Sequence, residues 1–123
     1  MLIWIAIGGA AGTVSRYLLG GVVQRASAAA FPVGTVAVNV IGCFLIGVLV
    51  QHYMHLQTSP IIRAVLITGF CGGFTTFSAF GIETTGLIEG GAYGKAAAYI
   101  VMSVSLSILA TFGGMAASKA LTA

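Results

Sequence analysis

Apolar and polar positions divide the chain into four long apolar blocks. The apolar runs cover about residues 2–23, 33–51, 61–82 and 96–117, and short stretches of small or polar residues separate them. Each run approaches the ~20 residues that an α-helix needs to cross the hydrocarbon core of a bilayer. The pattern predicts an all-α membrane protein, a single transmembrane domain over residues 1–123 with four transmembrane helices. We expect the third helix to continue to residue 88.

The third run carries an interruption. Residues 69–81, GFCGGFTTFSAFG, hold four glycines and two adjacent threonines, which lower helix propensity. Such a cluster either lets a neighbouring helix pack closely or breaks the helix. Broken helices at membrane depth expose backbone polar groups and commonly build ion sites in transport proteins. The four glycines together with the two adjacent threonines favour the second alternative, a break near residues 72–76 close to the membrane midplane.

Composition places the chain far from soluble domains, because 59% of its residues are hydrophobic and 6% are charged, with a mean hydropathy of +1.09. We also expect the first run to stay in the mature protein. Small residues follow Arg25, as at a signal-peptide cleavage site, but the run is longer than a signal core, has no basic residue before it and contains Arg16.

The few basic residues are nearly balanced between the two predicted sides of the membrane. Arg25 and Lys95 fall on one side, Arg63 and Lys119 on the other, and Arg16 lies within the first run. Because excess lysine and arginine in cytoplasmic loops sets orientation, this balance predicts dual topology and pairing of two chains as an antiparallel homodimer in lipid. The alternative is one orientation set by other features. The basic residues are scattered, so no nucleic-acid partner is expected.

Several polar or aromatic side chains interrupt the apolar runs. Arg16 either attracts anions into a water-filled cavity or satisfies backbone carbonyls. Asn39 either joins helices by hydrogen bonds or lines a polar path. Phe77 and Phe80 share one helix face, where they meet lipid or core, or turn their positive ring edges toward an anion. Glu83 follows near the end of the same segment.

The fourth run carries a hydroxyl at every fourth residue: Tyr99, Ser103, Ser107 and Thr111. This spacing puts the hydroxyls on one slowly winding helix face. The stripe either makes interhelical hydrogen bonds or forms a row of donors along which a small anion passes.

Together these features resemble the small fluoride-exporting channels of bacteria, the Fluc or CrcB-type family. The resemblance covers nearly the whole chain. Its motifs are Gly12-x-x-x-Arg16-Tyr17, Gly34-Thr35-x-x-x-Asn39, the segment from Thr68 to Phe80 that contains GGFTTFSAF, and the serine stripe of the fourth run.

The resemblance implies a fluoride-selective passive channel of the bacterial inner membrane, built as an antiparallel dual-topology homodimer with two pores. By this resemblance, Phe77 and Phe80 contact fluoride through their ring edges and Asn39 is a nearby donor. Tyr99, Ser103 and Ser107 continue a polar track, with Thr111 at its end. Arg16 lies in the vestibule, and Glu83 is a pore-region carboxylate. The backbone carbonyls of Gly72 and Thr75 from both subunits hold a structural Na⁺.

Three other classes of protein make different predictions. A small proton-coupled drug exporter requires a carboxylate in its first helix, whereas residues 1–82 contain neither Asp nor Glu. A non-transporting structural subunit of a membrane complex predicts that the purified protein conducts nothing. An enzyme is not expected, because the sequence shows no nucleophile–base–acid set or metal cluster.

Overall fold

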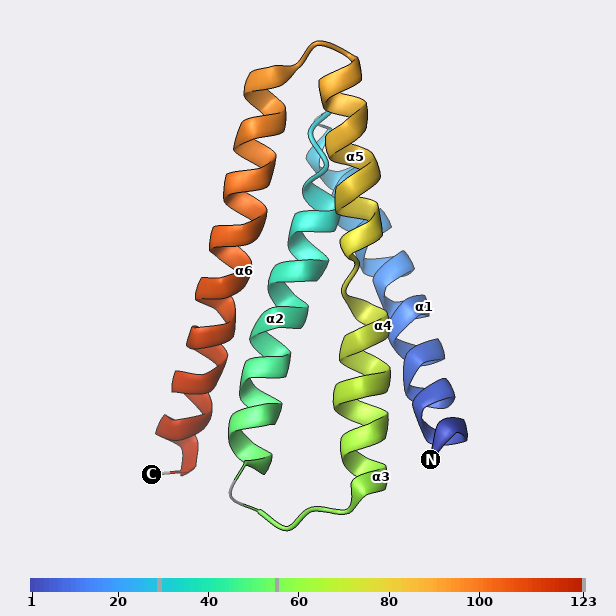
Figure 1. The fold of residues 1–123 in the computed structure, drawn as a ribbon, viewed down its shortest axis with the longest axis vertical. Coiled ribbons are helices and arrows are strands. Elements are labelled where there is room, and N and C mark those ends of the chain that lie inside the picture. The colour runs from blue at the N-terminus through green and yellow to red at the C-terminus, as the bar shows by residue number, and fades with distance from the viewer. Residues whose placement is uncertain (29, 55, 123) are drawn as a thin grey trace.

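The computed structural model describes residues 1–28, 30–54 and 56–122, which form long helices side by side (Figure 1). In this part of the chain four helical spans are long and apolar enough to cross a membrane. The elements in order are α1 (Leu2–Ser27), α2 (Val33–Tyr53), α3 (Pro60–Arg63), the π-helix η1 (Ala64–Cys71), α4 (Gly72–Phe74), α5 (Phe77–Glu89) and α6 (Tyr93–Thr122). The prediction of an all-helical protein with four spans is confirmed.

The third span consists of α3, η1 and α4, followed after an interruption by α5. Thr75 and Thr76 are extended, with φ/ψ of −87°/157° and −149°/115°. The hydroxyl of Thr75 donates to the Cys71 carbonyl at 3.1 Å, while the hydroxyl of Thr76 accepts from the amide of Ala79 at 3.2 Å and caps α5. The predicted interruption is therefore confirmed, and the two threonines form it.

Two glycines before the break, Gly69 and Gly73, have a different role, which is close packing against α1. A Cβ on Gly73 would lie 2.6 Å from the carbonyl oxygen of Gly9, and one on Gly12 would lie 2.2 Å from that of Phe70. Small residues that let backbones approach in this way are the usual basis of helix association in lipid. Both interpretations of residues 69–81 thus hold, each for different residues.

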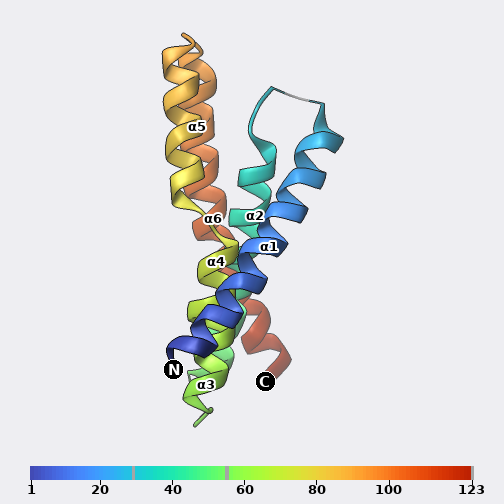
Figure 2. The ribbon, with the colours of Figure 1, turned by 90° about the vertical axis from the view of Figure 1, so that its right-hand side faces the viewer.

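The break also changes which helix the third span contacts. Before it, η1 and α4 pack against α1; after it, α5 lies beside α6, while α1 and α2 diverge from α5 (Figures 1 and 2). Along its other half, α6 packs on α2, where a Cβ on Gly114 would lie 2.1 Å from the Phe44 carbonyl oxygen. The extended threonines therefore lie between the part of the third span that packs on α1 and the part that packs on α6.

Candidate functional site

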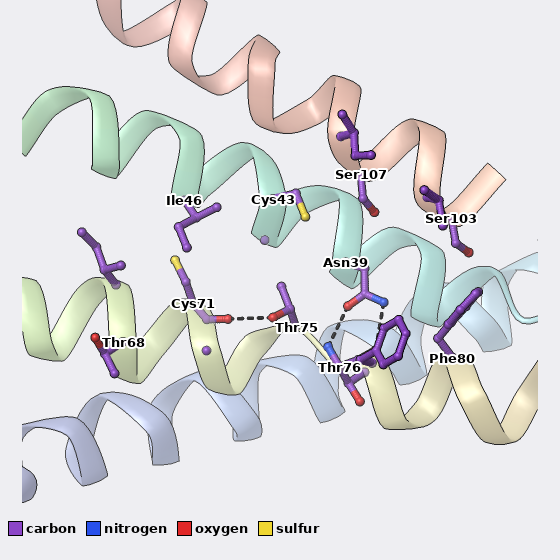
Figure 3. Close-up of a pocket in the computed structure, with 16 residues that line it drawn as sticks. Asn39, Cys43, Ile46, Thr68, Cys71, Thr75, Thr76, Phe80, Ser103 and Ser107 are labelled. Carbon is purple, nitrogen blue, oxygen red and sulfur yellow. Dashed lines mark hydrogen bonds between the residues drawn. The ribbon is translucent and has the colours of Figure 1, made fainter. Parts of the chain in front are cut away.

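Asn39 of α2 binds the backbone of the break at two points. Its Nδ2 donates to the carbonyl of Thr76 at 3.1 Å, and its Oδ1 accepts from the amide of Thr76 at 2.7 Å (Figure 3). In a continuous helix the Thr76 amide would bond to the carbonyl of Gly72. Asn39 therefore replaces the missing helical bond and joins two helices. A second hydrogen on Nδ2 remains for another acceptor.

A cavity of about 510 Å³ lies beside this break (Figure 3). Residues of α2, of the third span and of α6 line it, and none of these lining residues carries a formal charge. Its polar lining residues are Asn39, Thr68, Thr75, Thr76, Ser103 and Ser107. The cavity offers amide and hydroxyl groups in otherwise apolar surroundings, where electrostatic interactions are stronger than in water.

The rings of Phe77 and Phe80 border the same cavity from the first turn of α5. Their centroids are 5.5 Å apart with an interplanar angle of 40°. Phe80 also packs against Tyr99 of α6, with centroids 5.2 Å apart. Phe77 is 82% exposed, so it presents its ring on the outer surface of the chain, while Phe80 packs inward against Tyr99.

The hydroxyl side chains of α6 that recur at every fourth residue lie in different environments. Tyr99 is fully buried, and Ser103 and Ser107 line the cavity. Thr111 donates its hydroxyl to the Ser107 carbonyl at 2.9 Å and is not among the described lining residues. The hydroxyl of Ser103 is buried and has no hydrogen-bond partner within the described residues. Since a buried hydroxyl without a partner is unfavourable, Ser103 has a free polar atom for a ligand in this cavity.

A second cavity of about 240 Å³ lies on the α1 side of the break. Arg16, Gln24, Thr35, Thr76 and Glu83 are its polar lining residues, and Thr76 lines both cavities. The Nε of Arg16 donates to the Gly73 carbonyl at 3.1 Å. This carbonyl belongs to the last turn before the break, where helical partners are missing. Arg16 therefore satisfies a backbone carbonyl, and its remaining N–H groups are further donors beside the cavity.

Each carboxylate oxygen of Glu83 accepts a hydrogen bond from one hydroxyl. Thr35 of α2 donates to Oε1 at 2.8 Å, and Tyr99 of α6 donates to Oε2 at 2.5 Å. The carboxylate thus connects α5 to two other helices and fixes the hydroxyl of Tyr99, whose ring contacts Phe80. The predicted side chains that line one of the two cavities are Arg16, Asn39, Phe77, Phe80, Glu83, Ser103 and Ser107. Tyr99 contacts Phe80 and Glu83, and Thr111 contacts the backbone of Ser107.

Sequence reasoning missed two side chains that the structure brings into the site, Thr35 and Thr76. Thr35 precedes Asn39 by four residues and so lies on the same helix face, a spacing that was available in the sequence. Thr76 was seen only as a helix-weakening residue, whereas its backbone is the partner of Asn39. No side-chain pattern could identify the Gly73 carbonyl as the acceptor for Arg16.

The carbonyls proposed for sodium have suitable surroundings. Gly72 and Thr75 both line the larger cavity, and the amide that would bond to the Gly72 carbonyl is bound by Asn39 instead. Carbonyl oxygens suit hard cations. Within residues 1–28, 30–54 and 56–122, no group of three or more His, Cys, Asp or Glu side chains could hold a metal.

The structure so far defines a multi-pass membrane protein whose interrupted third span borders a cavity with polar donors. Residues 3–115 match the family described as CrcB-like protein, Camphor Resistance (CrcB), and the chain belongs to this family. The resemblance found in the sequence is thereby confirmed.

Proteins named fluoride-specific ion channel FluC are similar to the chain over nearly its whole length. The one from Rhizobium meliloti is 47% identical over 121 residues, which cover 98% of this chain and 97% of the relative. That from Cereibacter sphaeroides is 47% identical over 118 residues, covering 96% and 94%. That from Sulfurovum sp. is 40% identical over 121 residues, covering 98% and 95%.

Proposed function

We propose that the chain is a fluoride-selective passive ion channel, not an enzyme, and that it exports F⁻ from the cytoplasm. The observation that carries this proposal is the cavity at the break, where amide, hydroxyl and aromatic side chains converge without a charged lining residue. The names of the relatives, which cover almost the entire chain, support the same ion.

The donor set suits a small, strongly hydrated anion. A pore must replace the ion's hydration shell, yet bind it weakly enough that it leaves again. The Ser103 hydroxyl, the second Nδ2 hydrogen of Asn39 and the positive edges of the Phe77 and Phe80 rings supply partial charges only. A lysine or arginine at the same place would hold the ion far more tightly.

No energy source beyond the membrane potential is required for export. An inside-negative potential drives an anion outward with roughly 2.3 kcal/mol per charge per 100 mV. In acidic surroundings HF enters as a neutral molecule and dissociates in the neutral cytoplasm, so fluoride accumulates inside. A passive pathway then releases it down its electrochemical gradient.

We infer further that two chains pair in antiparallel orientation in the bacterial inner membrane, with two pores per dimer. The balanced basic residues support dual insertion. The exposed ring of Phe77 beside the cavity supports a partner at that face, because a second chain would close the cavity on its open side. Bilayer lipid covers the remaining apolar surface of the helices.

We also propose a structural Na⁺ held by the Gly72 and Thr75 carbonyls of both subunits. A bound cation would neutralise carbonyl dipoles that the break frees, and would fix the two breaks relative to each other. Replacing Na⁺ by a large organic cation should then lower the thermal stability of the dimer. An unchanged melting temperature over a wide Na⁺ range would refute this site.

The channel proposal is tested by ion efflux from liposomes. Purified protein is reconstituted in vesicles loaded with KF or KCl, valinomycin is added to release K⁺, and ion-selective electrodes record the anion. Fast fluoride release with negligible chloride release is expected. Release of neither anion above the level of protein-free vesicles would contradict the proposal and favour a non-transporting structural subunit. Equal release of both would refute selectivity.

A further inference from the structure

The start of α2 is held by a side chain from another helix. Its N-cap is Pro32, which makes no side-chain capping bond, and the first amides of a helix have no intrahelical partner. Gln24, in the last turns of α1, fills this role: its Oε1 accepts from the Gly34 amide at 3.0 Å, and its Nε2 donates to the Phe31 carbonyl at 3.0 Å. One amide thus grips the chain on both sides of Pro32.

Close contact between the backbones of α1 and α2 leaves little room for the start of α2 to move relative to Gln24. A Cβ on Gly34 would lie 2.4 Å from the carbonyl oxygen of Gly20 on α1. The two helices therefore touch through backbone where Gln24 binds, and a shift of the α2 start would break both hydrogen bonds together. We call Gln24, Phe31 and Gly34 the glutamine clamp.

The clamp lies directly beside residues that contact the candidate ion path. The ring of Phe31 meets the ring of Tyr99 edge-on, with centroids 5.5 Å apart and an interplanar angle of 84°. Thr35, which follows Gly34, donates to Glu83. Tyr99 in turn donates to Glu83 and packs on Phe80. The segment held by Gln24 therefore supports both the ring and the hydroxyl partner of Tyr99.

We propose that Gln24 is a positioning residue for ion conduction. It holds the start of α2 so that Phe31 braces the Tyr99 ring and Thr35 fixes Glu83, and these two contacts set the orientation of Phe80 at the cavity. Gln24 acts through these residues and needs no contact with the ion in the larger cavity. The inference rests on the proposed channel function, and the test below separates the two.

Three single variants test the clamp in the liposome efflux assay. Gln24→Leu removes both hydrogen bonds, Gln24→Glu keeps the acceptor for Gly34 but loses the donor to Phe31, and Gln51→Leu, at the opposite end of α2, is the matched control. We expect fluoride efflux to fall roughly tenfold in Gln24→Leu, the effect of losing one to two net hydrogen bonds. Gln24→Glu sets a carboxylate oxygen against the Phe31 carbonyl and should lower efflux at least as far as Gln24→Leu, and Gln51→Leu should equal the wild type.

A double-variant cycle distinguishes positioning from general weakening. Because Phe31 is one of the two residues through which Gln24 acts, Phe31→Leu alone should lower efflux, and Gln24→Leu should lower it by a smaller factor in the Phe31→Leu background than in the wild type. If the two substitutions caused independent structural defects, their fold losses of efflux would instead multiply. Wild-type efflux in Gln24→Leu, or losses that multiply in the double variant, would overturn the proposal. Should Gln24→Leu not fold, Gln24→Glu and Phe31→Leu form the same cycle.

Hydrogen exchange gives a readout that does not depend on fluoride. The Gly34 amide should exchange faster in Gln24→Leu than in the wild type or in Gln51→Leu, because its acceptor is gone. Unchanged exchange would refute the clamp even if efflux fell. If the wild type conducts no fluoride but the Gly34 amide is protected through Gln24, the channel function fails while the clamp itself stands.

Discussion

The paired hydrogen bonds between Asn39 and Thr76 predict a measurable loss of stability in Asn39→Ala. The substitution leaves both the amide and the carbonyl of Thr76 without the partners that the structure gives them at 2.7 and 3.1 Å. Interhelical hydrogen bonds in membrane proteins contribute on average about 0.6 kcal/mol and at most about 1.7 kcal/mol each. Losing two should therefore destabilise the protein by about 1–3 kcal/mol.

Equilibrium unfolding in detergent measures this change. Ile41→Ala is the control, because Ile41 lies two residues away on the same helix and is 43% exposed. The effect of Ile41→Ala on the free energy of unfolding should stay within about 0.5 kcal/mol.

A second variant, Asn39→Asp, keeps an acceptor for the Thr76 amide but brings a carboxylate oxygen against the Thr76 carbonyl. It should suppress fluoride efflux, since negative charge then stands at the anion path. If Asn39→Ala is as stable as Ile41→Ala, the hydrogen bonds of Asn39 do not stabilise the break. Normal fluoride efflux in Asn39→Asp would show that Asn39 does not lie on the ion path.

Other substitutions separate conduction from packing. Replacing Phe77 or Phe80 by Ile should lower fluoride efflux and leave the dimer intact by size-exclusion chromatography; unchanged efflux in both variants would exclude ring edges from the mechanism. Ser103→Ala removes a buried hydroxyl that has no partner among the described residues, so we expect equal or slightly higher stability together with reduced efflux, and unaltered efflux would contradict its role as a donor. Gly114→Ala should lower the melting temperature strongly, because its Cβ would lie 2.1 Å from a backbone carbonyl of α2, whereas Gly86→Ala, with open space around it, should not; similar melting temperatures would refute close packing of α2 and α6.

The sequence predicted the spans and the interruption because both depend on local composition. Four apolar runs are long enough for a bilayer, and the adjacent threonines Thr75 and Thr76 are the two residues that become extended. Helix ends were less predictable: α6 extends from Tyr93 to Thr122, beyond the apolar run, since polar and small residues continue a helix readily once it has begun.

The candidate site was predictable only in its side chains. Polar residues within apolar runs are unusual, so Asn39, Arg16 and the serines of α6 could be selected from the sequence. The partners of Arg16 and Asn39 could not be predicted, because those partners are backbone groups at the break, the carbonyls of Gly73 and Thr76. The division of the hydroxyl stripe likewise depends on how α6 is rotated, which the spacing of residues does not specify.

If the proposed function is right, fluoride occupies the cavity beside Asn39, Phe80 and Ser103. Solid-state ¹⁹F NMR can detect the ion at this place. Protein with ¹³C-labelled phenylalanine rings and serine Cβ atoms is reconstituted in lipid with fluoride and frozen. We predict a bound fluoride signal dipolar-coupled to both labels, with the serine coupling weakened in Ser103→Ala. A bound signal that lacks these couplings, or no bound signal, would contradict the assignment of fluoride to this cavity.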